Sequence, residues 1–179
     1  MNTNIEKIKN NLSENPDLCT RQLKVGGQDI SIIFIKSTLD KMLFVHSVLS
    51  PLLEYKGEVS YEILQNQVIK AIEIELIEED YEKNLLKNKI LLFIGQQNKA
   101  LSIDLEFIPM RNPEEPPTSP TINGPREGFT ESVKTTTALI RKRCPSKDLV
   151  IKNFFVGNIT NTQVCVYYIK RNDMVPKRI

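Results

Sequence analysis

The 179-residue sequence contains no tryptophan, one histidine and three cysteines, and each scarcity excludes a class of protein. The cysteines, Cys19, Cys144 and Cys165, are odd in number and widely spaced, so they predict neither a disulfide framework nor a paired metal-binding motif. The single histidine, His46, cannot supply two zinc ligands and has no nucleophile motif beside it. We therefore expect no catalytic residues, no metal site and no cofactor.

Long apolar runs are also missing. The longest, residues 90–94, is far shorter than the ~18–20 residues that cross a bilayer. The polar start lacks the basic and apolar regions of a secretory signal, so we expect a soluble chain without a signal peptide. The 24 Lys and Arg nearly balance the 22 Asp and Glu, which predicts a folded chain of one domain or two small ones.

The charge is unevenly distributed along the chain. Residues 121–179 contain 11 Lys and Arg against 4 Asp and Glu, a net charge of +7, and the first 120 residues carry −5. A basic segment suits nucleic acid, anionic lipid headgroups or an acidic protein surface. Few aromatic residues interleave with these cations and no nucleic-acid-binding motif is present, so we expect no nucleic-acid partner.

Hydrophobic periodicity predicts alternating helices and strands. The expected helices cover residues 4–12, 39–53, 61–70, 78–88 and 127–143. The expected strands cover residues 21–25, 30–36, 71–76, 90–94, 100–107, 149–156 and 163–169. In the second helix we expect Ser37 or Thr38 as the N-cap, and a buried face of Leu39, Met42, Leu43, His46, Leu49 and Leu53.

These elements predict an α/β fold, with α+β as the alternative, in which helices pack on a mixed sheet. A mixed sheet is favoured because two strand connections are too short for crossovers. Six of the ten prolines lie between residues 109 and 125, which predicts an extended connector. We expect an N-terminal αβ subdomain over 1–112, a connector over 113–125, and a helix plus two strands over 126–179. One domain interrupted by this Pro-rich connector is the alternative.

One short motif stands out at the start of the last predicted helix. Two glycines flank a Pro-Arg-Glu sequence, so the backbone can approach another group closely, and helix N–H groups follow. Three interpretations remain: Arg126 binds a phosphate, Arg126 and Glu127 bond neighbouring charges across a rigid turn, or the Arg residues contact another chain. The candidate interaction residues are Gly124, Pro125, Arg126, Glu127, Gly128, Phe129, Glu131, Arg141 and Arg143.

This motif, together with residues 139–143 and 164–169, resembles the N-terminal domain of the A subunit of GerA-type spore germinant receptors. Residues 31–35 and 101–104 fit the same family in order, so the resemblance covers most of the chain. It implies a non-enzymatic receptor component at the spore inner membrane, placed on a soluble face. The implied partners are a transporter-like B subunit, a lipoprotein C subunit and further A subunits.

Nutrient recognition in that family is attributed to the B subunit, so the resemblance implies signal transmission or complex assembly for this domain. The family's A subunits continue into membrane helices, and we therefore expect this sequence to be a truncated fragment that reaches the membrane through missing helices or partners. Two alternatives remain: an anion- or nucleotide-binding domain that reuses the fold, and a non-functional remnant.

Overall fold

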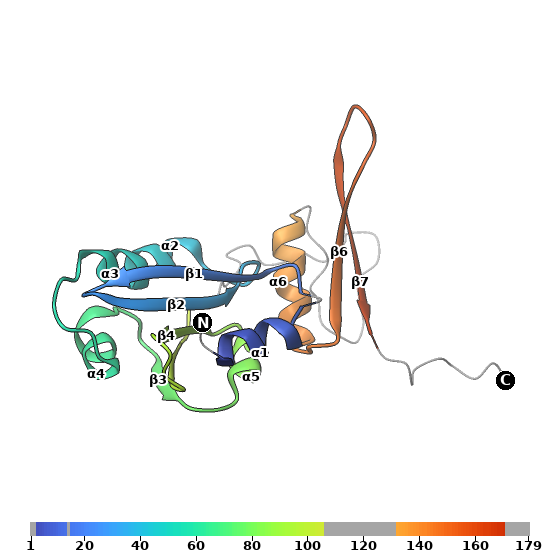
Figure 1. Ribbon diagram of the computed structural model, residues 1–179. Helices are drawn as coiled ribbons and strands as arrows, with labels where there is room; N and C mark the ends of the chain where they lie inside the picture. The colour runs from blue at the N-terminus through green and yellow to red at the C-terminus, as the bar shows by residue number, and fades with distance from the viewer. Residues whose placement is uncertain (1–2, 14, 106–131, 171–179) are drawn as a thin grey trace, which may run out of the picture.

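The computed structural model describes residues 3–13, 15–105 and 132–170 (Figure 1). A five-stranded sheet has the order β1-β2-β4-β5-β3, and a separate two-stranded sheet consists of β6 and β7. The strands are β1 (Leu18–Val25), β2 (Gln28–Ile35), β3 (Ile74–Ile77), β4 (Ile90–Ile94), β5 (Ala100–Ile103), β6 (Leu149–Val156) and β7 (Thr162–Ile169).

Helical segments cover both faces of the larger sheet, and one helix accompanies the smaller sheet (Figure 1). The α-helices are α1 (Thr3–Asn11), α2 (Lys41–Leu43), α3 (Ser50–Glu54), α4 (Tyr61–Ile63), α5 (Tyr81–Leu86) and α6 (Val133–Arg143). Two π-helical segments, η1 (Phe44–Leu49) and η2 (Leu64–Val68), continue α2 and α4.

The first two expected strands form a hairpin around two glycines. Val25 pairs with Gln28, which leaves only Gly26 and Gly27 in the turn. Their φ angles are 53° and 79°, and a two-residue hairpin turn with positive φ at both positions favours glycine. The turn is therefore shorter than the gap of residues 26–29 between the two expected strands.

The core lies in two layers because β4 is buried on both faces. Ile90, Leu92 and Ile94 pack with η1, α3 and η2, while Leu91 and Phe93 pack with α1 and α5. Successive strand residues point to opposite faces, so a central strand covered on both sides needs an unbroken apolar run. Figure 1 shows α2 and α3 over one face of the sheet and α1 and α5 over the other.

The predicted fold class, a mixture of helices and sheet, is confirmed. One detail differs, because all pairings among the described strands are antiparallel and the sheet is not mixed in direction. The reason is the connection between β2 and β4: it passes through the helices on one face, the edge strand β3 and then α5 on the other face. No single-helix crossover joins neighbouring described strands, so the arrangement corresponds to the α+β alternative.

The expected buried face of the second helix is wrong for most of its members. Met42, Leu43, His46 and Leu53 are exposed, and Phe44, Val48 and Leu52 are buried instead. The π-helical turn explains the shift, since Ser50 N–H donates to the carbonyl of Val45, five residues earlier. Each π turn contains an extra residue, which rotates the following side chains out of the expected register.

The caps and ends of these segments also differ from the sequence predictions. Asp40 caps α2, accepting hydrogen bonds from Met42 N and Leu43 N, so neither Ser37 nor Thr38 is the N-cap. Strand β3 begins at Ile74, three residues later than expected. Helix α6 begins at Val133 with Ser132 as its cap, and residues 106–131, including the Pro-rich connector, lie outside the described residues.

Within the described ranges, no helix has the length and apolar content needed to span a membrane.

Candidate functional site

Arg141 joins α6 to the turn between α1 and β1. Its Nη2 donates to Oδ1 of Asn15 at 2.5 Å and lies 3.4 Å from Oδ2 of Asp17. Arg141 is only 2% exposed, and burial lowers the pKa of its guanidinium, an effect that the Asp17 carboxylate opposes. The turn itself is fixed, because Asn15 Oδ1 also accepts from Asp17 N–H, and the Asp17 carbonyl accepts from Lys36 N–H.

The two-stranded sheet of β6 and β7, which we call the ribbon, has two faces, and one of them contacts α6. Thr137 Oγ1 lies 2.7 Å from the carbonyl of Val133 and 2.7 Å from the hydroxyl of Tyr167. Because the single hydroxyl proton of Thr137 goes to Val133, Tyr167 donates in the second bond. Burial raises the pKa of Tyr167, so this tyrosine remains a donor at neutral pH. The inner face of the ribbon is thereby attached to α6.

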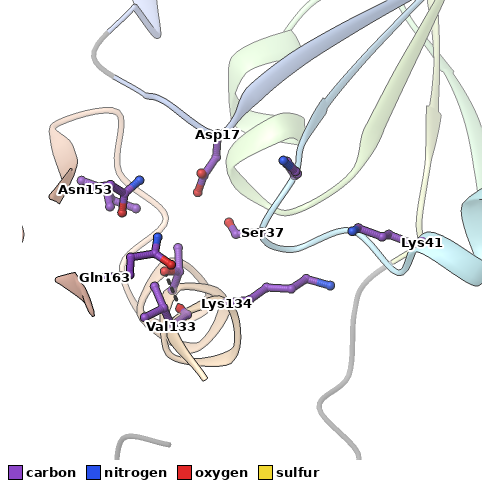
Figure 2. A pocket seen from close by; sticks show the side chains of 10 residues that line it. Asp17, Ser37, Lys41, Val133, Lys134, Asn153 and Gln163 are labelled. Atoms are coloured by element: carbon purple, nitrogen blue, oxygen red, sulfur yellow. Dashed lines mark hydrogen bonds between the residues drawn. The ribbon is translucent and has the colours of Figure 1, made fainter. Parts of the chain in front are cut away.

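A cavity of about 300 Å³ lies beside these contacts, between the end of β2, α6 and the ribbon (Figure 2). Its lining residues are Asp17, Lys36, Ser37, Lys41, Val133, Lys134, Thr137, Ile151, Asn153 and Gln163. Figure 2 shows Lys41 and Lys134 extending into this space from opposite sides. Three lysines and one aspartate therefore meet at a junction of segments that are far apart in the sequence.

The opposite face of the ribbon is largely apolar and is exposed beyond Val150, which is buried. In the β6–β7 register, Lys152, Phe154 and Val156 lie opposite Val166, Val164 and Thr162. Side chains on directly paired residues share a face, and this face is turned away from Tyr167 and α6. We call it the outer face of the ribbon; its large apolar members, 37% to 56% exposed, are Phe154, Val156, Val164, Val166 and Tyr168.

Seven of the nine predicted site residues, namely Gly124 to Phe129 and Glu131, lie outside the described residues. The structure places the other two at the end of α6: Arg141 bonds within the chain, and Arg143 is exposed. Sequence reasoning missed the cavity, because its lysines come together only in the folded chain. It also missed the outer face, although the alternation of apolar residues in both predicted strands could have indicated it.

Comparison with known proteins identifies the family. The family model described as Bacillus/Clostridium GerA spore germination protein matches residues 6–178. Spore germination protein KA of Bacillus subtilis (strain 168) is 26% identical over 175 residues, which cover 93% of this chain and 32% of that protein. Spore germination protein B1 of the same organism is 25% identical, and the match covers 98% of this chain and 37% of that protein. The chain spans about a third of the length of these relatives.

A solved structure shares the fold. The crystal structure of the N-terminal domain of the A subunit of the Bacillus megaterium spore germinant receptor GerK3 matches with a TM-score of 0.60 at 19% identity. The match covers 93% of this chain and 63% of that chain. The resemblance inferred from the sequence is therefore confirmed, and the chain belongs to the Bacillus/Clostridium GerA family of spore germination proteins.

Proposed function

We propose that this chain acts within the A subunit of a nutrient germinant receptor, in complex assembly or signal transmission during bacterial spore germination. Its family and the relatives named above support a role in germination. The chain spans about a third of the length of those relatives. Its participation in the activity of a whole receptor is therefore proposed. The receptor complex would place this domain at the spore inner membrane, on a soluble face.

The outer face of the ribbon is the observation that carries this proposal. A two-stranded sheet is marginally stable by itself and gains stability when an apolar face is covered. Here the Thr137–Tyr167 bond attaches the inner face to α6, although Phe155 on that face is 65% exposed, and Phe154, Val156 and Val164 are exposed together on the outer face. Figure 1 shows the ribbon standing beside α6 and extending beyond the larger sheet, where another chain can reach it.

The composition of the outer face fits a protein partner. Exposed apolar patches that include aromatic residues are typical of protein interfaces. Lys152 Nζ lies 5.8 Å from the centre of the Tyr168 ring, so one cation borders the apolar patch. We propose another receptor subunit as the occupant: the transporter-like B subunit, the lipoprotein C subunit or a second A subunit. We also propose that residues 124–129, with Glu131, contact another chain, as their sequence motif suggests.

Serine substitutions at the cross-strand pair Phe154 and Val164 test the proposal. In spores that express the full receptor, F154S/V164S is expected to reduce co-purification of the A subunit with the other subunits by about tenfold or more, because central apolar contacts dominate interface affinity. The germination rate in response to nutrients should fall with it.

Ile72 provides a matched control because it is fully exposed and lies in the loop before β3, away from the ribbon. I72S should leave co-purification unchanged. Normal co-purification of F154S/V164S, or an equal loss in I72S, would contradict assembly through the outer face. Circular dichroism of each purified chain checks that the variants still fold.

A further inference from the structure

The cavity between β2 and α6 concentrates positive charge from three separate elements. Lys36 follows β2, Lys41 begins α2, and Lys134 belongs to the first turn of α6. Among the described residues, Asp17 is the only acidic residue of the lining, and its carboxylate lies 3.4 Å from the guanidinium of Arg141. Arg141 thus offsets the charge of Asp17, and the cavity keeps the positive charge of Lys36 and Lys41.

Two of these lysines have no acidic partner among the described residues. Neither Lys36 nor Lys41 forms an ion pair with a described carboxylate, although both line the cavity. Lysine presents a compact point charge with three donors, which suits the oxygens of a phosphate. The two ammonium groups therefore remain available to an anion from solution.

Ser37 provides an independent observation at the same place. Ser37 is 6% exposed, and its hydroxyl has no hydrogen-bond partner in the part of the chain that the structure describes. Buried hydroxyl groups in proteins nearly always have a partner, so an unpaired one needs an explanation. In Figure 2 the Ser37 oxygen points away from its own loop, toward the space that faces Asp17 and α6. An oxygen atom of a ligand in the cavity would supply the missing acceptor.

The start of α6 adds to the positive potential. Val133 and Lys134, its first two residues, line the cavity. The N-terminal end of a helix carries a partial positive charge and favours anions. Helix α6 has 11 residues, long enough for this effect.

We propose that this cavity binds a small phosphate-bearing anion through Lys36, Lys41 and the hydroxyl of Ser37. Its volume of about 300 Å³ is at the lower end for small-molecule sites, so a single phosphate group or a small phosphorylated solute fits and a dinucleotide does not. The site is separate from the outer face of the ribbon, and it goes beyond the proposed role in assembly. The phosphate can come from a free solute or from a lipid headgroup.

Titration of the 179-residue chain with inorganic phosphate and pyrophosphate tests the site, with calorimetry at low ionic strength as the readout. The double variant K36Q/K41Q is expected to weaken binding at least about tenfold, since two charge-assisted contacts are lost. S37A should weaken binding about threefold without lowering Tm, because the hydroxyl forms no hydrogen bond with a described residue when the cavity is empty. K24Q, which removes an exposed lysine on β1 outside the cavity, should bind as the parent does.

Sedimentation with phosphatidylglycerol vesicles and with phosphatidylcholine vesicles distinguishes the two phosphate sources. If phosphate or pyrophosphate binds and K36Q/K41Q weakens this binding, the site is one for a phosphorylated solute. Binding to phosphatidylglycerol alone, lost in K36Q/K41Q and kept in K24Q, supports a site for a lipid headgroup phosphate. Absence of binding to both, or equal weakening by K24Q and K36Q/K41Q, would overturn the proposal.

Discussion

Arg141 links two parts of the chain that are more than 120 residues apart. Its side chain donates to Asn15 and faces Asp17, and both acceptors belong to the turn between α1 and β1. The arginine-rich sequence at the end of α6 drew attention to this residue, but the sequence gives no sign of its partners. Such a contact depends on how α6 packs on the turn, which local patterns do not contain.

The substitution R141A is expected to lower the free energy of unfolding by about 2–4 kcal/mol, because it leaves the buried Asn15 and the Asp17 carboxylate without their cation. Urea unfolding followed by circular dichroism measures the change. R21A is the control, since Arg21 is exposed on β1 and its loss should cost less than about 0.5 kcal/mol. Similar losses in the two variants would show that Arg141 is not a structural link.

Tyr61 makes the free energy of unfolding depend on pH in the alkaline range. Its hydroxyl donates to the Lys99 carbonyl at 2.5 Å and accepts from Ile94 N–H at 3.2 Å, and burial raises its pKa above the unfolded value of 10.0. The folded chain therefore keeps this proton when the unfolded chain has lost it. The contribution of Tyr61 to stability is complete below about pH 10 and decreases as the pH rises toward the folded pKa.

Urea unfolding between pH 8 and pH 11 should show this loss, and Y61F should have a shallower decrease above about pH 10 than the parent chain. At neutral pH, Y61F should be less stable by about 1 kcal/mol, because two hydrogen bonds are removed. Parallel pH profiles for Y61F and the parent would contradict this role.

At the scale of single elements, the strands were predicted better than the helices. Strand β4 is an unbroken apolar run and β6 has the predicted bounds, because burial on a sheet leaves a direct pattern in the sequence. The helix predicted over residues 39–53 was given the wrong buried face, since a π turn changes the register without a local signal.

Tertiary contacts compensate for the irregular helix. Pro51 has no N–H to bond with the carbonyl of Ser47, and that carbonyl instead accepts from Lys70 N–H at 2.9 Å. The bond comes from the segment that follows η2, so the continuation of the helix past Pro51 depends on a partner elsewhere in the chain. The proline within this segment therefore does not by itself mark the end of the helix.

The turn between β1 and β2 allows a paired test. Both glycines have positive φ, but a Cβ on Gly26 would collide with the carbonyl oxygen of Gly57 and lie 2.9 Å from Val59 Cγ2, whereas a Cβ on Gly27 would meet nothing within 4 Å. G27A is expected to cost about 1 kcal/mol from backbone strain alone. G26A should cost about 2–4 kcal/mol, because overpacking adds to that strain. Thermal unfolding compares them, and equal losses would show that the approach of Gly57 is unimportant.

At the scale of the whole molecule, the sequence predicted the family and the mixture of helices and sheet, and both are confirmed. It did not predict the lysine-lined cavity, because Lys36, Lys41 and Lys134 lie on three elements whose packing is a property of the complete fold. The candidate motif at residues 124–129 lies outside the described residues, so its role stays a prediction. The proposed anion site and the proposed interface are at different places: the cavity lies between β2, α6 and the ribbon, and the outer face is on the side of the ribbon that is turned away from α6.

The central claim is that another receptor subunit covers the outer face of the ribbon. Hydroxyl-radical footprinting measures this directly, because it oxidises exposed aromatic and sulfur-containing side chains. Phe154 and Tyr168 should be oxidised in the isolated chain and protected several-fold in spore membranes that contain the assembled receptor. Met42, which is 67% exposed on α2, should be oxidised equally in both preparations. Equal oxidation of Phe154 and Tyr168 in the two preparations would contradict the claim.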